Sequence, residues 1–265
     1  MTAEERLALV LAKVDRARKH FEELSAALVA YRESKPGKIV PRRDPDTRRM
    51  TYVLESIESL PAGLASVVGD VLQNLRSALD HLAYQLVLVG TGKDASEDAI
   101  YFPIANDAQR FAQLVKGGQV HGARPEAVAA IEAVQPYKVG NDLLTQLHRL
   151  NIIDKHRALL LVGSSYQAMD VMPKLKQIAK AADIAMPPFG PLWLQPADKL
   201  FPMKAGAVLY VDEPDAEPDP KIQFLFDVEL SEPAVVRGHM PLLKTVKSVS
   251  TEVDRIVRSF LPLLQ

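Results

Sequence analysis

The stretch VVGDVLQNLRSALDHLAYQLVLV, from Val67 to Val89, decides the fold. Large apolar residues recur in it at spacings of three and four: Val68, Leu72, Leu75, Leu79, Leu82 and Leu86. This spacing places them on one side of an α-helix and predicts that this side faces a core. Arg76 and Asp80 lie one turn apart on one flank of the stripe, where they can form an ion pair.

Polar residues also mark the other flank of this helix, at Asn74 and His81, with Ser77 nearby. A second stretch, LLTQLHRLNIIDKHRALLLV from Leu143 to Val162, has large apolar residues on all its sides. Such a helix is usually buried. Seven polar or charged residues are nevertheless packed into ten consecutive positions of it: His148, Arg149, Asn151, Asp154, Lys155, His156 and Arg157.

Buried charges are costly unless they are paired and hydrogen-bonded, so the polar residues of the second helix need partners. We expect these partners on the first helix. The predicted polar network joins Asn74, Arg76, Asp80 and His81 of one helix to Asn151, Asp154, Lys155 and His156 of the other. If the network only supports the fold, replacing Asp154 by alanine is expected to lower the melting temperature sharply.

The composition is that of an ordinary globular protein, with 48% hydrophobic and 25% charged residues among 265. A net charge of −1 gives no overall attraction to nucleic acid or anionic membranes, so we expect no DNA and no membrane as partners. The chain has no cysteine, which excludes disulfides and thiolate zinc sites and favours a reducing compartment, the cytoplasm. The apolar run near the N-terminus is too short for a signal peptide or a membrane span.

Helical spacing also predicts an amphipathic helix over residues 3–33, with Thr2 and Glu5 at the spacing of a capping box. Residues 38–56 predict a β-hairpin, and we interpret its four arginines, Arg42, Arg43, Arg48 and Arg49, as a solvated tip. Shorter helices are expected at 106–116 and 124–134. The segment Tyr101–Ile104 is expected to plug into the bundle, and a last helix runs from 241 to about 260.

Between Gly163 and Met240 prolines become frequent and the helical rhythm disappears. Residues 166–172, 207–212 and 222–230 have the β-branched and aromatic character of strands. The predicted fold class is therefore mainly α (α+β). A helical bundle of residues 1–163 and 241–265 carries the 38–56 hairpin, and a small antiparallel β-rich insertion, 164–240, precedes the last helix.

The string Arg76-Ser77-Ala78-Leu79-Asp80-His81 is an Arg-x4-His motif inside a helix. It resembles the motif of the HEPN superfamily, helical bundles that cleave RNA without a metal and commonly dimerise. The resemblance implies a metal-independent endoribonuclease of defence or toxin type, acting on RNA as a homodimer without a cofactor. It further implies that Arg76 and His81 are catalytic, that Asp80 orients one of them, and that Ser77 occupies a polar position beside the arginine.

A non-catalytic bundle is the alternative function, in which the polar network is structural and the protein binds a partner or itself. The longer pattern LxNLRSALDHLAYQL with FPI, QPY and NIIDKHR resembles uncharacterised bacterial helical proteins and implies no activity. Histidine and aspartate are suitable metal ligands, but no HExxH motif or i,i+4 histidine pair is present, so we expect no metal site. P-loop, GxGxxG and GxSxG motifs are also absent from the sequence.

Overall fold

The computed structural model describes residues 1–93, 99–156, 162–196, 200–230 and 240–265. The fold is mainly α, with two small antiparallel sheets, as the sequence predicts. The chain forms two compact units. The helical unit comprises Met1–Ala26, Gly63–Leu161 and Ser231–Gln265, and the sheet unit comprises Ala27–Ala62 and Val162–Leu230.

The elements of the helical unit are the first part of α1 (Ala3–Glu33), then α2 (Leu64–Thr91), α3 (Ala108–Lys116), α4 (Pro125–Ala133), α5 (Pro136–Val139), α6 (Leu143–His156), β7 (Met240–Pro241), α8 (Leu242–Ser259) and the 3-10 helix η1 (Leu261–Leu264). The predicted capping box opens α1. The amide of Glu5 donates to Thr2 Oγ1 at 3.2 Å, and the amide of Thr2 donates to Glu5 Oε2 at 2.9 Å. These two bonds satisfy donors that the helix itself leaves free.

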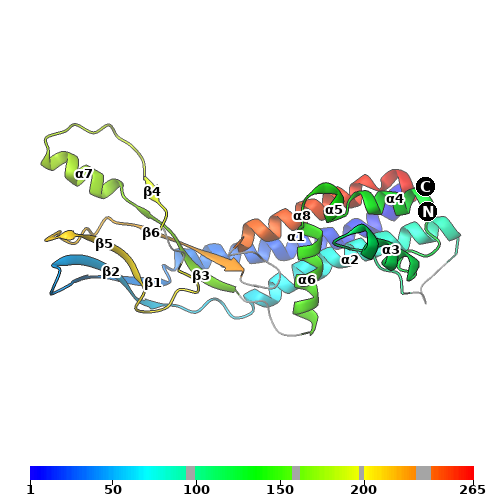
Figure 1. Cartoon of the computed structure of the whole chain (residues 1–265), viewed down its shortest axis with the longest axis horizontal. Helices are drawn as coiled ribbons and strands as arrows, with labels where there is room; N and C mark the ends of the chain where they lie inside the picture. Colours follow the sequence, from blue (N-terminus) through cyan, green and yellow to red (C-terminus); the bar gives the residue numbers. More distant parts are fainter. Residues whose placement is uncertain (94–98, 157–161, 197–199, 231–239) are drawn as a thin grey trace. The chain divides into compact units, whose positions relative to one another are not determined.

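Helix α2 is the centre of the helical unit, because it packs against both α6 and α8. In Figure 1, α8 runs alongside α2 and α6 crosses it. The predicted leucine stripe of α2 is buried throughout, and so is the stripe of the last helix, from Leu242 to Phe260. Within the described part of the chain, no helix has the length and apolar character needed to cross a membrane.

Helix α6 is shorter and less buried than the sequence predicts. Its helical residues end at His156, and Val162, predicted as the end of the helix, begins strand β3. Residues 157–161 lie outside the described part. One face of α6 is buried, but Ile152 on the other is 40% exposed. A short apolar run such as Leu159–Val162 fits a helix and a strand equally well, which explains the error.

The sheet unit contains β1 (Gly37–Arg43), β2 (Arg49–Ile57), β3 (Val162–Asp170), α7 (Met172–Ala181), β4 (Trp193–Leu194), β5 (Val208–Pro214) and β6 (Phe224–Leu230). Strands β1 and β2 form the predicted hairpin. Strand β2 also pairs with β5, with Tyr52 opposite Tyr210. The hairpin therefore belongs to the sheet unit and not, as we predict from the sequence, to the bundle. The prediction is wrong because a pairing between strands so distant in sequence leaves no local signal.

Strand β3 pairs with β4 and β6 in a second sheet, in the order β4-β3-β6 within this unit. The core of the unit consists of Leu54, Tyr166, Met169, Met203 and Leu209. Helix α7 was not predicted, since it lies in a region read entirely as strands and loops. Pro173 lies in the first turn of α7, where the backbone N–H that proline lacks would have no partner within the helix. Pro173 is therefore compatible with the start of this helix.

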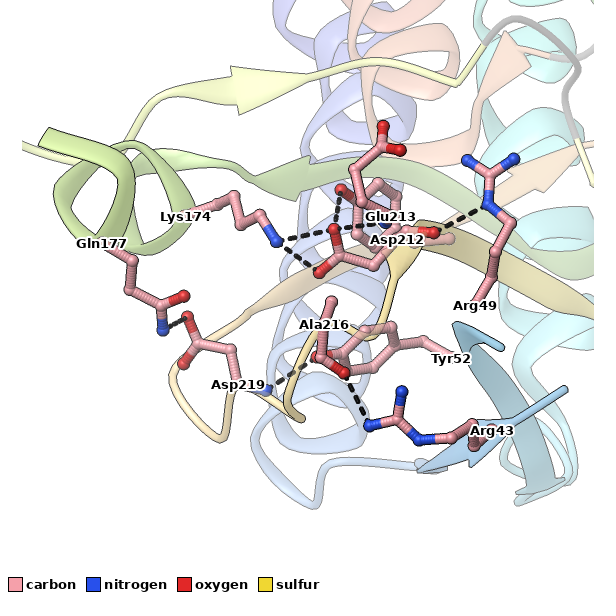
Figure 2. A network of polar contacts seen from close by, with 10 residues as sticks. Arg43, Arg49, Tyr52, Lys174, Gln177, Asp212, Glu213, Ala216 and Asp219 are labelled. Atoms are coloured by element: carbon pink, nitrogen blue, oxygen red, sulfur yellow. Dashed lines mark hydrogen bonds and ion pairs between the residues drawn. The ribbon is translucent and has the colours of Figure 1, made fainter. Parts of the chain in front are cut away.

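The hairpin arginines are not simply solvated, as we had interpreted them. Arg43 Nη2 donates to the carbonyl of Ala216 at 2.9 Å, and Arg49 Nε donates to the carbonyl of Asp212 at 2.9 Å (Figure 2). Arg48 forms an ion pair with Asp215 at 2.7 Å, although both side chains are exposed. The arginines of the hairpin tip thus bind β5 and the segment that follows it.

Candidate functional site

The predicted ion pair between Arg76 and Asp80 forms on α2, and it holds a segment of backbone. Arg76 Nη2 lies 2.8 Å from Asp80 Oδ1 and donates to the carbonyl of Phe102 at 2.9 Å. The amide of Phe102 donates in turn to Asp80 Oδ1 at 2.9 Å. The backbone N–H and C=O of Phe102 are therefore both satisfied by the ion pair of Arg76 and Asp80, four residues apart on α2. We call this arrangement the Phe102 clamp.

A second clamp holds the next residues of the same segment. Gln135, whose side chain is fully buried, accepts from the amide of Ala105 at 2.9 Å and donates to the carbonyl of Pro103 at 2.8 Å. The ring of Phe102 is also fully buried and meets Phe260 edge-on, with centroids 6.4 Å apart. The segment therefore plugs into the bundle as predicted, and α2 and the residue before α5 fix its backbone.

Arg76 is buried, and only one of its two terminal nitrogens is satisfied. Its Nη1 is buried and has no hydrogen-bond partner among the residues that the structure describes. Burial lowers the pKa of Arg76 and raises that of Asp80, because each charge has lost water, while their mutual attraction opposes both shifts. An unpaired buried donor on a charged group is unfavourable, so Nη1 marks a place where an acceptor would stabilise the protein.

Arg76 lines a pocket of about 270 Å³ in the helical unit. Three arginines and one histidine contribute to its walls: Arg76, Arg110, Arg149 and His148. Phe102, Ile104 and Leu114 line an apolar part, and no aspartate or glutamate is among the described lining residues. Arg149 is exposed and has no ion-pair or hydrogen-bond partner in the described chain. The pocket therefore combines a high local positive charge with hydrogen-bond donors.

His148 is neutral in this pocket. Burial, reinforced by the positive charges of Arg76 and Arg149, lowers its pKa to about 4. A neutral imidazole can donate from one ring nitrogen and accept at the other. An anion between the arginines would favour the protonated form, so the charge of His148 depends on what the pocket holds.

Three predicted residues of α2 lie away from this pocket. His81 is exposed; partial burial and the charge of Lys13 in α1 lower its pKa, while Asp80 opposes the shift. An offset of five residues separates two helical side chains by about 140°, which accounts for the divergence of Arg76 and His81. Asn74 donates to the carbonyl of Asp70 at 2.8 Å, and Ser77 accepts from Gln73 at 3.3 Å.

The predicted residues of α6 do not bond directly to those of α2. In the described part of the chain, no hydrogen bond or ion pair joins the two sets, which corrects the expected network. Lys155 and His156 are exposed, although the charge of Lys155 lowers the pKa of Asp80. Asn151 is buried with its Oδ1 unpartnered in the described residues. The two helices are coupled by packing and by charge.

The carboxylate of Asp154 lies against Gly69 of α2. A Cβ atom on Gly69 would lie 2.5 Å from both carboxylate oxygens of Asp154, so only glycine allows this approach. Burial and the nearby charge of Asp70 raise the pKa of Asp154. Its neighbours therefore disfavour the ionised form, and no ion pair of Asp154 with α2 is found among the described residues.

Sequence reasoning missed the composition of the pocket. Arg110 was not singled out, and His148 and Arg149 were noticed without a role. One signal was available for Arg149, which has no acidic residue three or four positions away on α6. In the part of the chain that the structure describes, no group of three or more histidine or acidic side chains is placed to hold a metal ion.

No family model, curated protein or solved structure matches the chain. We therefore infer the function from the geometry and electrostatics of the pocket.

We predict that Asp154→Asn stabilises the protein at pH 7 and that this gain shrinks as the pH falls. The pKa of Asp154 is raised in the folded state, so its ionised form destabilises the fold above that pKa, and the penalty disappears as the pH falls toward the unperturbed value of 3.8. Melting temperatures of both proteins across this range test it, with the exposed Glu22→Gln as control. A lower melting temperature at every pH would contradict this assignment.

Proposed function

We propose that the helical unit binds the phosphate group of a ligand in the pocket of Arg76, Arg110, Arg149 and His148. One observation carries the proposal. Arg76 Nη1 is a buried, unpartnered donor on a residue that lines a pocket with two further guanidinium groups and no described carboxylate. Phosphate and carboxylate are the groups that guanidinium binds best, through paired charge-assisted hydrogen bonds.

The Phe102 clamp explains why Arg76 is available to a ligand. Asp80 and the Phe102 carbonyl both bind Nη2, so the ion pair fixes the guanidinium but leaves Nη1 unused. A fixed donor loses little freedom on binding, which favours affinity. Arg110 and Arg149 are exposed, and each can move to complete the coordination of an anion.

The pocket also limits the size of the ligand. A volume of about 270 Å³ accommodates a phosphate with a small group attached. Ile104 and Leu114 offer that group an apolar contact. A small phosphate ester and a phosphate at the end of an RNA strand share this chemistry, and both are compatible with the pocket.

We predict that the protein binds inorganic pyrophosphate and that Arg149→Gln weakens binding roughly tenfold, the effect of losing one charge-assisted hydrogen bond. Titration calorimetry measures it. Arg124→Gln, which removes an exposed arginine outside the pocket, is the matched control and is expected to bind as the unchanged protein does. Equal affinity in both variants, or no binding at all, would contradict the proposed phosphate site.

The pH dependence of anion binding is a separate prediction. Sulfate keeps its charge across the range, and a bound sulfate favours protonated His148, so binding takes up a proton. Affinity is therefore expected to rise as the pH falls from neutral toward the pKa of about 4 and to level off below it. In His148→Gln the rise should be smaller. A rise of the same size in both proteins would remove His148 from the site.

A metal-independent endoribonuclease is the second candidate function, and the placement of Arg76 favours it. Arg76 belongs to the Arg-x4-His motif, and it is also the pocket-lining residue whose buried Nη1 has no hydrogen-bond partner among the described residues. In such a reaction a histidine takes the proton from a ribose 2′-OH, whose oxygen attacks the phosphorus to form a 2′,3′-cyclic phosphate; the bond to the 5′-oxygen breaks, and that oxygen takes a proton from water. Guanidinium stabilises the charge that develops on the phosphate.

This candidate requires a second copy of the chain. His81 is exposed and diverges from Arg76, so the proposed catalytic His81 acts on RNA held by Arg76 of a partner in a homodimer. Asp80 then positions Arg76 through the Phe102 clamp. The cytoplasm provides both RNA and the reducing conditions that suit a chain without cysteine.

We predict that single-stranded RNA is cleaved in the presence of EDTA and that His81→Ala abolishes cleavage. Gel analysis of labelled RNA measures it, with His121→Ala, a loop histidine outside the pocket, as the control. Cleavage that persists in His81→Ala would reject the assignment. No cleavage by the unchanged protein, together with intact pyrophosphate binding, would leave the phosphate-binding function alone.

A further inference from the structure

Exposed apolar side chains gather in one part of the sheet unit, on α7 and the segment that leads to β4. Six of them lie between residues 178 and 194, each between 40% and 61% exposed: Ile178, Ile184, Phe189, Leu192, Trp193 and Leu194. Single exposed apolar residues are normal, but six large ones within one short segment are unusual and make this segment a candidate interaction surface. We call residues 172–194 the apolar arm.

Lysines lie next to the apolar residues of the arm. Lys176 and Lys180 line a shallow hollow of about 380 Å³ together with Ile184 and Met186. Both lysines are exposed, and neither has an ion-pair partner in the described chain. Asp183 also lines the hollow and is the arm's acidic residue. The surface therefore combines large apolar and aromatic side chains with a local excess of positive charge.

Both ends of the arm are fixed to the sheets by hydrogen bonds and an ion pair. Lys174 Nζ lies 2.6 Å from Oδ1 of the buried Asp212, and Gln177 donates to Asp219 at 2.8 Å (Figure 2). At the far end of the arm, the amide of Leu192 donates to Asp170 Oδ1 at 2.9 Å. The same oxygen accepts from the amide of Met172, so Asp170 joins the beginning of the arm to its end.

We propose that the apolar arm docks onto an anionic lipid bilayer. Tryptophan and phenylalanine prefer the boundary between lipid chains and head groups, where Trp193 and Phe189 would insert. Lys176 and Lys180 would then contact lipid phosphates, and charge complementarity of this kind favours an anionic membrane over a neutral apolar partner. Such docking is peripheral and needs no spanning helix. It goes beyond the proposed phosphate pocket, which lies in the other unit.

This proposal departs from our expectation that no membrane is a partner. That expectation used the net charge of −1, which averages over the whole surface. Membrane attraction falls off within about a Debye length, roughly 10 Å, so a local group of lysines decides it.

The test uses Trp193, the only tryptophan in the chain, as its own probe. With vesicles of phosphatidylcholine and phosphatidylserine, the full chain is expected to sediment with the lipid, and its fluorescence to shift to shorter wavelength. Lys176→Glu with Lys180→Glu should weaken binding tenfold or more, and Phe189→Ser should also weaken it. Val139→Ser, which removes an exposed apolar residue of the helical unit, should leave it unchanged.

Three outcomes would overturn the proposal. The first is unchanged fluorescence with anionic vesicles, and the second is equal binding by the double lysine variant and the Val139→Ser control. The third is a dimer in sedimentation velocity that Phe189→Ser dissociates, without vesicle binding, because a second copy would then cover the arm. Circular dichroism of each variant establishes that it is folded.

Discussion

The Phe102 clamp is the interaction on which the helical unit depends. It uses an ion pair between the buried Arg76 and the partly buried Asp80, one turn apart on α2, to satisfy both backbone groups of a residue whose ring is fully buried. Removing either charge would leave the other partly or fully desolvated without its partner, together with an unsatisfied peptide group. The clamp also determines the chemistry of the pocket, because it orients Arg76 and occupies only one of its terminal nitrogens.

Local patterns predicted much of the fold because they report local structure. The Thr2–Glu5 capping box, the leucine stripe of α2 and the Arg76–Asp80 pair each depend on residues within one or two helical turns, and all three form. The pairing of β2 with β5 joins residues far apart in sequence, and the apolar run before β3 fits two kinds of structure. The periodicity of the sequence could predict neither the pairing of β2 with β5 nor the strand that begins at Val162.

In the candidate site, too, the local contacts could be predicted from the sequence and the tertiary contacts could not. Sequence spacing could place Arg76 beside Asp80, but the walls of the pocket come from α3, α6 and the segment after α2, whose approach is a tertiary property. Asp154 shows how pattern reasoning fails here. Its position on an apolar helix implied a stabilising partner, whereas the fold places it against Gly69 and near a like charge. Net charge was also uninformative, because the cations of the pocket are balanced by acids elsewhere.

The central claim is that the free donor of Arg76 binds an anion, and diffraction from crystals soaked in tungstate tests it most directly. Tungstate resembles phosphate in shape and charge, and its anomalous signal locates it without ambiguity. We predict a tungstate oxygen about 3 Å from Arg76 Nη1, with the guanidinium of Arg149 turned toward the ion. Tungstate bound only elsewhere, with the pocket filled by water, would contradict the account.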